Sequence, residues 1–404
     1  AELQKLDLNK ISVYDKIDGA DEKTAIQNGL LEYIGKAVDD AYIAKIKEGL
    51  INVNALKQFA PTLKVVYTPL NGSGLEPVKR ILKEIGVKDL YVVKEQQAPD
   101  GNFPTLKTPN PEDPSAFDYA LRLAEKVNAD LVVATDPDAD RLGVYVKGKD
   151  GFVPLTGNQC GALLCEYVVS EKAKNKTLPK NGVVFSTIVS GKLGSAIAEE
   201  YGISYEEVLT GFKYIGDKIR EYLESGEKTF VFGYEESYGL LPFDCARDKD
   251  SVAAVAVLCE AAAVAKSEGL TLADKFTALY EKYGYYKEKS FSVTLKGVFG
   301  AKKIAAKTDE LRHSEINEIA GERVIAVRDY LIGERKDALG NKTQINLPKS
   351  NVIYFELDGG WCCVRPSGTE PKIKFYAGVV GKTQEDANEK TAKLTEWLKK
   401  FAES

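Results

Sequence analysis

The sequence predicts two α/β domains followed by a smaller α+β domain, and three observations support this fold class. Short apolar strands are followed by polar or glycine-rich turns and then by helical patterns, an order typical of α/β folds. From about residue 288 the pattern changes, because alternating strands dominate and one helical pattern closes the chain. The length of 404 residues fits two or three domains at roughly 150 residues per domain.

The first α/β pattern extends to about residue 157. A strand enters a glycine-rich turn at 69–74 before a helical pattern begins. A later loop, 99–114, is dense in Pro, Asn and Asp, which favours irregular backbone. The predicted strands are 63–68, 90–93 and 131–134, and the predicted helices are 21–33, 76–85 and 116–128. This order predicts a sheet with helices packed against it.

The pattern recurs between about 158 and 287 and is followed by the α+β part. The run 251–267 is rich in Ala and Val, so we expect a largely buried helix. The other predicted elements before residue 287 are helices at 159–170 and 192–201 and strands at 183–185 and 229–232. The α+β part contains predicted strands at 291–295, 351–357, 361–364 and 372–379 and a closing helix at 383–401.

Composition argues against several classes of protein. The chain has 55 Lys and Arg against 60 Asp and Glu, a net charge of −5, so we expect no nucleic-acid partner. No apolar run approaches the roughly 20 residues that span a bilayer, and residues 1–7 show no secretory pattern. The six cysteines show no C-x-x-C spacing, which favours free thiols in a reducing compartment. We therefore expect a cytoplasmic protein without a membrane partner.

Three carboxylates alternate in the turn after the strand 131–134. Asp136, Asp138 and Asp140 can converge on one point, and their mutual repulsion favours a cation with oxygen ligands, such as Mg²⁺ or Ca²⁺. A solvated acidic turn is the alternative, although strand ends in α/β folds are ligand positions. An EF-hand is excluded, because a basic residue stands at each of the two positions that need Gly and Glu. A phosphatase with Asp136 as nucleophile fits the motif in part.

Two further loops combine charge, hydroxyl groups and glycine. The segment 365–372 offers the planar fork of Arg365, two hydroxyl side chains and exposed backbone N–H groups, which suit a phosphate. The segment 233–239 brackets two acids and a hydroxyl with glycines, and it can accept hydrogen bonds from sugar hydroxyls. Lys249 can exchange protons with a substrate, although the aspartates on either side favour its charged form. In each case the alternative is an ordinary turn or a salt-bridged helix start.

Taken together, these stretches resemble the α-D-phosphohexomutase superfamily, the phosphoglucomutases and phosphomannomutases. The most specific segments are 134–143, 209–216, 233–239 and 365–376, and they occur in the family's order. The resemblance covers nearly the whole chain and is closest to bacterial enzymes of this kind. It implies a four-domain enzyme around a central cleft, in which the first three domains share a mixed α/β topology and the last is a smaller α+β domain.

The resemblance also implies roles for individual residues. Asp136, Asp138 and Asp140 would bind Mg²⁺, Arg141 would lie beside the family's phosphorylated serine, and Lys249 would act as general acid or base. The residues implied to bind the hexose phosphate are Thr210, Gly211, Glu235, Ser237, Arg247, Arg365, Ser367, Gly368 and Thr369.

One departure from the family is large. The family's first domain carries its phosphoserine in a Ser-His-Asn-Pro segment, which does not occur in these 404 residues. The chain also contains no Met. We therefore expect residues 1–36 to be a junction that follows a first domain. Residues 37–157, 158–287 and 288–404 are then expected to be the metal-binding, sugar-binding and phosphate-binding domains.

The activity implied for the parent enzyme is interconversion of glucose 1-phosphate and glucose 6-phosphate, with mannose phosphates left open. The reaction would pass through the phosphoserine and a 1,6-bisphosphate, with Mg²⁺ as metal and glucose 1,6-bisphosphate as activator. Two alternatives remain: a sugar-phosphate-binding or regulatory protein without mutase activity, and a Mg²⁺-dependent phosphatase. The sequence does not indicate an oligomeric state.

Overall fold

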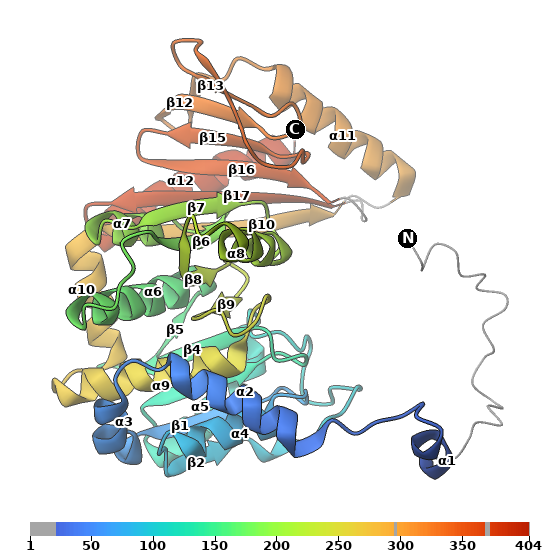
Figure 1. Cartoon of the computed structure of the whole chain (residues 1–404). Coiled ribbons are helices and arrows are strands. Elements are labelled where there is room, and N and C mark those ends of the chain that lie inside the picture. The colour runs from blue at the N-terminus through green and yellow to red at the C-terminus, as the bar shows by residue number, and fades with distance from the viewer. Residues whose placement is uncertain (1–21, 295–296, 368–371, 404) are drawn as a thin grey trace. The chain divides into compact units, whose positions relative to one another are not determined.

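The computed structural model describes residues 22–294, 297–367 and 372–403 (Figure 1). The described residues from 45 onward form one compact unit, and the described residues 22–44 belong to another. Among the described residues of the larger unit the strands make three sheets, two of them mixed and one antiparallel. The predicted class of two α/β parts followed by an α+β part is therefore confirmed.

The first sheet has the strand order β2-β1-β3-β4-β5. Strand β1 pairs in parallel with β2 and β3, whereas β4 pairs antiparallel with β3 and β5. The strands are β1 (Lys64–Thr68), β2 (Asp89–Val92), β3 (Leu131–Thr135), β4 (Leu142–Lys147) and β5 (Phe152–Leu155). Every residue of β3 is buried, as its continuous apolar sequence predicts, and its carboxyl end leads directly into Asp136.

The second sheet repeats this topology with the order β7-β6-β8-β9. Strand β6 pairs in parallel with β7 and β8, and β8 pairs antiparallel with β9. The strands are β6 (Gly182–Thr187), β7 (Ser204–Val208), β8 (Thr229–Tyr234) and β9 (Leu240–Leu241). Strand β8 thus corresponds to β3, so the loops that begin after Thr135 and Tyr234 leave equivalent ends of the two sheets.

Helices accompany both mixed sheets, and α9 connects them. The helices are α3 (Val53–Phe59), α4 (Leu75–Glu84), α5 (Asp118–Val127), α6 (Gly157–Lys174), α7 (Leu193–Glu200), α8 (Lys213–Ser225), α9 (Ser251–Ser267) and α10 (Leu272–Tyr283), and α2 (Gly35–Gly49) precedes them in sequence. The predicted helix 251–267 is confirmed and largely buried, and the Asp250 side chain caps it by accepting from the Ala253 N–H. It follows the second sheet in sequence but packs against α3 and α4.

The helix expected at 21–33 is shorter than its pattern suggested. Helix α1 (Glu22–Gln27) ends early, because Gly29 adopts φ +68°, a left-handed conformation that terminates helices. The expected boundary at residue 37 lies two residues inside α2. None of the helices in the described part of the chain combines the length and apolar character that crossing a membrane requires.

The third sheet is antiparallel, with the order β10-β17-β16-β15-β12-β13-β14. Its strands, with β11 paired to β12, are β10 (Tyr285–Thr294), β11 (Glu318–Ile319), β12 (Glu322–Asp329), β13 (Glu334–Asp337), β14 (Lys342–Gln344), β15 (Ile353–Leu357), β16 (Gly360–Pro366) and β17 (Lys372–Gly381). Helices α11 (Gly297–His313) and α12 (Gln384–Glu403) pack against it over an apolar core that includes Ile353, Phe375 and Leu398.

A second apolar cluster joins the antiparallel sheet to the second mixed sheet. We call it the seam cluster; its buried members are Ile188, Val189, Leu209, Tyr330, Val352, Tyr354, Trp361, Cys363 and Tyr376. The first three belong to loops after β6 and β7, and the others belong to the antiparallel sheet or its flanks. An ion pair of 2.9 Å between Arg328 and Glu207 crosses the same junction.

Candidate active site

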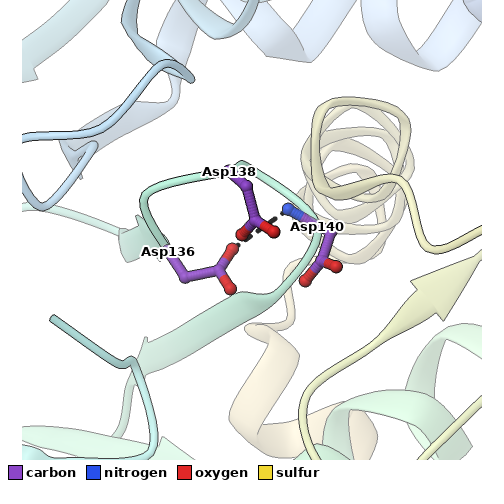
Figure 2. Close-up of side chains that lie close together, drawn as sticks. All are labelled: Asp136, Asp138 and Asp140. Atoms are coloured by element: carbon purple, nitrogen blue, oxygen red, sulfur yellow. Dashed lines mark hydrogen bonds between the residues drawn. The ribbon is translucent and has the colours of Figure 1, made fainter. Parts of the chain in front are cut away.

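The turn after β3 brings three aspartates together. The chain reverses sharply there, because Ala139 adopts a left-handed backbone with φ +59°. The Asp136 carboxylate accepts hydrogen bonds from the backbone N–H groups of Asp140 and Arg141 at 3.0 and 2.9 Å. One carboxylate oxygen from each of Asp136, Asp138 and Asp140 lies within 4.8 Å of the other two (Figure 2). The convergence expected from their spacing is therefore present.

These carboxylates, in the metal loop (136–140), fit a divalent cation. Burial, helped by the negative charges of Asp140 and Asp138, raises the pKa of Asp136 to about 7. Oδ1 of Asp140 is buried and has no hydrogen-bond partner among the described residues. A hard cation bound by all three groups would satisfy that oxygen and relieve the repulsion. A solvated acidic turn would leave all three side chains in water, whereas only Asp138 is exposed.

The metal loop is held from two sides. On one side, the backbone N–H and the hydroxyl of Ser73 donate to the Pro137 carbonyl at 2.8 and 3.0 Å. Gly72 leaves no room for a side chain, because a Cβ would lie 2.3 Å from Pro137 Cα. On the other side, the Ser251 N–H at the start of α9 donates to the Ala139 carbonyl at 3.3 Å. These contacts fix the loop, and the sequence did not identify either serine as a support.

Arg141 joins the metal loop to the turn after β8. Its Nη1 lies 3.0 Å from Glu112 Oε1, and its Nε lies 3.6 and 3.8 Å from two carboxylates of the metal loop. Arg141 and Gly239 also form an antiparallel β-bridge, and the Leu142 N–H donates to the Tyr238 carbonyl at 2.9 Å. Two loops that are about 100 residues apart in sequence therefore lie side by side.

Strand β8 ends in the sugar loop (233–239). The Glu235 N–H donates to the Gly239 carbonyl at 2.9 Å, and Tyr238 takes a left-handed φ of +69° to close the turn. Glu235 is buried and Ser237 is half-buried. Burial, followed by the charge of the adjacent glutamate, raises the pKa of Glu235 to about 7, although the cations of nearby Lys and Arg side chains oppose this.

Thr210 and Gly211 lie in the loop after β7, and Gly211 approaches the sugar loop. Gly211 has φ +118°, a conformation that side-chain-bearing residues rarely adopt. The backbone of Gly211 approaches the Glu235 carboxylate closely enough to lower its pKa. The structure thus brings Gly211 and Glu235 together, as their predicted shared role requires.

Lys249 bridges the metal and sugar loops. Its ammonium lies 2.9 Å from Asp140, 3.0 Å from Asp248 and 3.9 Å from Glu235. Burial lowers the pKa of Lys249, but the hydrogen bonds and charges of the two aspartates outweigh it, and the net pKa is raised. In this arrangement Lys249 carries its proton. The exposed guanidinium of Arg247 instead donates to two carbonyls of its own loop, at 3.0 and 3.2 Å.

Two positively charged side chains lie opposite each other on the antiparallel sheet. Arg365 at the end of β16 lies opposite Lys374 of β17, so both side chains stand on one face of the sheet. Neither has an ion-pair partner among the described residues, and like charges in opposite positions repel. An anion held between them would remove that cost. The Ser367 N–H closes the loop by donating to the Lys372 carbonyl at 2.7 Å.

The predicted loop residues Gly368 and Thr369 lie outside the described residues. Lys374 and Glu112 contact or adjoin the predicted residues Arg365 and Arg141, and the sequence alone did not identify either of them. The sequence places Lys374 in a predicted strand, with its side chain on one of the two faces of the sheet. It does not show that Arg365 lies opposite, because that depends on the register between the two strands. Glu112 belongs to the irregular loop 99–114, for which no periodic pattern was available.

Comparisons with known proteins agree with this geometry. Residues 40–150 match the family described as phosphoglucomutase/phosphomannomutase, alpha/beta/alpha domain II, and residues 156–283 match its domain III. Similar curated proteins include the phosphoglucomutase of Staphylococcus saprophyticus, which is 34% identical over 371 residues and covers 91% of this chain. The phosphoglucomutase of Staphylococcus epidermidis strain RP62A is 37% identical over 395 residues and covers 92% of this chain. The chain spans 66% and 71% of these two relatives, about two thirds of their length.

Solved structures share the fold at lower identity. A phosphoglucomutase/phosphomannomutase family protein from Burkholderia thailandensis has a TM-score of 0.57 and 19% identity, over 86% of this chain and 64% of its own. The open form of parafusin, a phosphoglucomutase from Paramecium, has a TM-score of 0.62 and 18% identity, over 90% and 61%. At such identities the likeness concerns the architecture alone.

Proposed function

Because the chain belongs to the phosphoglucomutase/phosphomannomutase family, we propose that it supplies the metal-, sugar- and phosphate-binding parts of a phosphohexomutase. That enzyme would interconvert glucose 1-phosphate and glucose 6-phosphate through a phosphoserine and a 1,6-bisphosphate. The observation that carries this proposal is the direct contact between the metal loop and the sugar loop, through the Arg141–Gly239 bridge and the Lys249–Asp140 ion pair. A phosphoryl group and the sugar that receives it need adjacent sites of this kind.

The sugar loop would hold and orient the hexose. Glu235 and Ser237 can accept hydrogen bonds from sugar hydroxyls, and Thr210 and Gly211 border the same space. Because Glu235 is buried, its hydrogen bonds face little competition from water. Lys249 carries a proton within reach of this loop, so it can donate that proton to a departing oxygen as general acid.

The antiparallel sheet would bind the phosphate that does not react. The Arg365 guanidinium presents a planar fork, and Lys374 adds a second positive charge on the same face. We propose Ser367, Gly368 and Thr369 as the rest of this phosphate site, on the strength of the family resemblance. Energy from binding this remote phosphate helps to position the reacting end of the substrate.

We propose Mg²⁺ as the metal, with Asp136, Asp138 and Asp140 as its protein ligands. When bound, Mg²⁺ neutralises charge on a transferring phosphoryl group. Arg141 would contribute a further positive charge beside that group, and Glu112 holds its guanidinium in place. Glucose 1,6-bisphosphate, the intermediate, would act as the activator.

The domain assignment also remains a proposal. It places the metal site in residues 37–157, the sugar site in 158–287 and the phosphate site in 288–404. We expect the enzyme to act in the cytoplasm, where a reducing environment suits its free cysteines. The phosphatase alternative finds no support, since the relatives described above are phosphoglucomutases.

Calorimetric titration of the 404-residue chain with glucose 6-phosphate tests the proposal. Binding should be measurable, and Arg365→Lys should weaken it at least tenfold, because Lys supplies the charge but not the fork. Arg323→Lys is a matched control, since Arg323 is exposed on the same sheet and pairs with Asp358. Absence of binding by the wild type would contradict the proposal.

A further inference from the structure

The hydroxyl of Tyr376 is a buried donor without a partner. Tyr376 is 2% exposed, and its hydroxyl makes no hydrogen bond among the described residues. Buried polar groups are nearly always paired, so an orphaned one calls for a specific explanation. Strand register places Tyr376 on the same face as Arg365 and Lys374, and the Lys374 ammonium lies 4.9 Å from the centre of its ring.

The Tyr376 side chain belongs to the seam cluster, which faces the loop after β6. The hydroxyls of Thr187, at the end of β6, and of Ser190, in that loop, donate to Oε2 of Glu236 at 3.0 and 3.4 Å. No hydrogen bond to Oε1 of Glu236 occurs within the described ranges. A donor on the antiparallel sheet and a carboxylate oxygen of the sugar loop thus both remain available at one junction.

Electrostatics supports this pairing. Burial raises the pKa of Tyr376, the negative charge of Glu236 raises it further, and the positive charge of Arg365 lowers it. The hydroxyl therefore keeps its proton and can only gain by donating it to an acceptor. Glu236 is the nearby carboxylate with the largest influence on it.

We infer that Tyr376 is a positioning residue of the proposed mutase, whose hydroxyl donates to Glu236 when a hexose phosphate bridges the sugar loop and the Arg365–Lys374 pair. The inference rests on the proposed function. A ligand that contacts both sides sets the spacing between them, and a hydrogen bond made only in that arrangement adds to ligand affinity. It contributes nothing to the stability of the free protein, where it is absent.

Tyr376→Phe tests the inference, because it removes the oxygen and keeps the ring. In calorimetric titrations of the 404-residue chain, glucose 6-phosphate should bind 5- to 10-fold more weakly to this variant. Inorganic phosphate, which occupies one side only, should change less than twofold. The ligand-free melting temperature should stay equal or rise, since a buried unpaired hydroxyl is lost. Tyr354→Phe, in the same cluster, is the matched control and should leave both affinities unchanged.

A double-mutant cycle identifies the partner. In a Glu236→Gln background, the Tyr376→Phe change should cost less than twofold, because the charged acceptor is gone. Equal costs in both backgrounds would overturn the assignment of Glu236, and unchanged glucose 6-phosphate affinity in Tyr376→Phe would overturn the inference while leaving the proposed function intact. Failure of the wild type to bind glucose 6-phosphate would instead reject the proposed function, and this inference with it.

Discussion

At the scale of single residues, the metal loop gives the sharpest expectation. Asp138→Asn should weaken Mg²⁺ binding at least tenfold, because one of three charged ligands to a hard cation is lost. Asp138 is the exposed member of the three, so the fold should not suffer. Calorimetric titration with MgCl₂ measures the change. Asp150→Asn, an exposed acid in the same part of the chain, should bind Mg²⁺ as the wild type does. Equal affinities for Asp138→Asn and wild type would mean that the loop is only a solvated turn.

Glu235 predicts a pH dependence of sugar binding. Its pKa is raised to about 7, chiefly by burial, so the carboxylate loses its charge as pH falls below 7. Charged acceptors make the stronger hydrogen bonds, and about a tenth of the charged form remains one pH unit below the pKa. Affinity for glucose 6-phosphate should therefore fall about five- to tenfold between pH 8 and pH 6.

Glu235→Gln isolates this effect from the titration of the ligand's own phosphate. The variant should bind about tenfold more weakly at pH 8, since the charge is absent at every pH. Its affinity should then vary less with pH than that of the wild type, when both are measured by calorimetry over the same range. Parallel pH profiles would show that Glu235 does not contact the sugar.

The sequence predicted which residues form the site where those residues are close together in the chain. Asp136, Asp138 and Asp140 lie within one turn, so their spacing alone predicted their convergence. The contact of Lys249 with Asp140 was not predictable in this way, because Asp140 follows a strand of the other mixed sheet. The pairing of Arg365 with Lys374 likewise depends on strand register, which hydrogen bonds between distant segments determine.

At the scale of elements, a strongly apolar composition predicted helix α9, whereas a polar sequence with a weak apolar stripe left α11 unrecognised. The Ala/Val-rich helix α9 (Ser251–Ser267) agrees with its predicted bounds, because its composition and its Asp250 cap both mark the ends. Helix α11 was not predicted, since its polar sequence shows only a weak apolar stripe. Strand β4 was also missed, because it is recognisable chiefly from its pairing with β3.

Helix α9 also carries a testable electrostatic contact. Glu260 is fully buried and accepts the Ile51 and Asn52 N–H groups at 2.7 and 2.5 Å, which ties α9 to the start of α3. Burial raises its pKa to about 7. The folded state therefore binds a proton at Glu260 more tightly than the unfolded state does. The contribution of Glu260 to the free energy of unfolding decreases as pH rises from about 4.5 to 7.

Glu260→Gln should remove that pH-dependent loss, because an amide oxygen can still accept both N–H groups. The variant should be more stable than the wild type at pH 8, by on the order of 1–3 kcal/mol, and nearly equal at pH 5. Urea unfolding at both pH values measures the difference. Glu227→Gln, an exposed acid, is the control and should track the wild type. A variant that is less stable at pH 8 would mean that the charged form of Glu260 is favourable.

At the scale of the whole molecule, the repeated topology explains why distant loops meet. Strands β3 and β8 occupy equivalent places in two sheets of the same topology, so the metal and sugar loops leave equivalent ends. The Arg141–Gly239 bridge then joins them. The alternation of strands and helices predicted two such parts, but their mutual orientation depends on α9 and on the loop contacts, which no local pattern encodes.

The proposed mechanism predicts that these 404 residues bind the hexose phosphate but do not convert it. Every transfer step proposed above begins or ends on a phosphoserine, and these residues contain no Ser-His-Asn-Pro segment. Without a covalent carrier, the phosphoryl group has no route between C1 and C6. A coupled assay for glucose 6-phosphate from glucose 1-phosphate, with Mg²⁺ and glucose 1,6-bisphosphate present, should show no sustained turnover by this polypeptide alone. Fusion to a family first domain should restore it, and changing that domain's serine to Ala should abolish it again. Turnover by the 404 residues above a no-enzyme control would require a nucleophile among them, and Asp136 would be the first to test by covalent phosphoryl labelling.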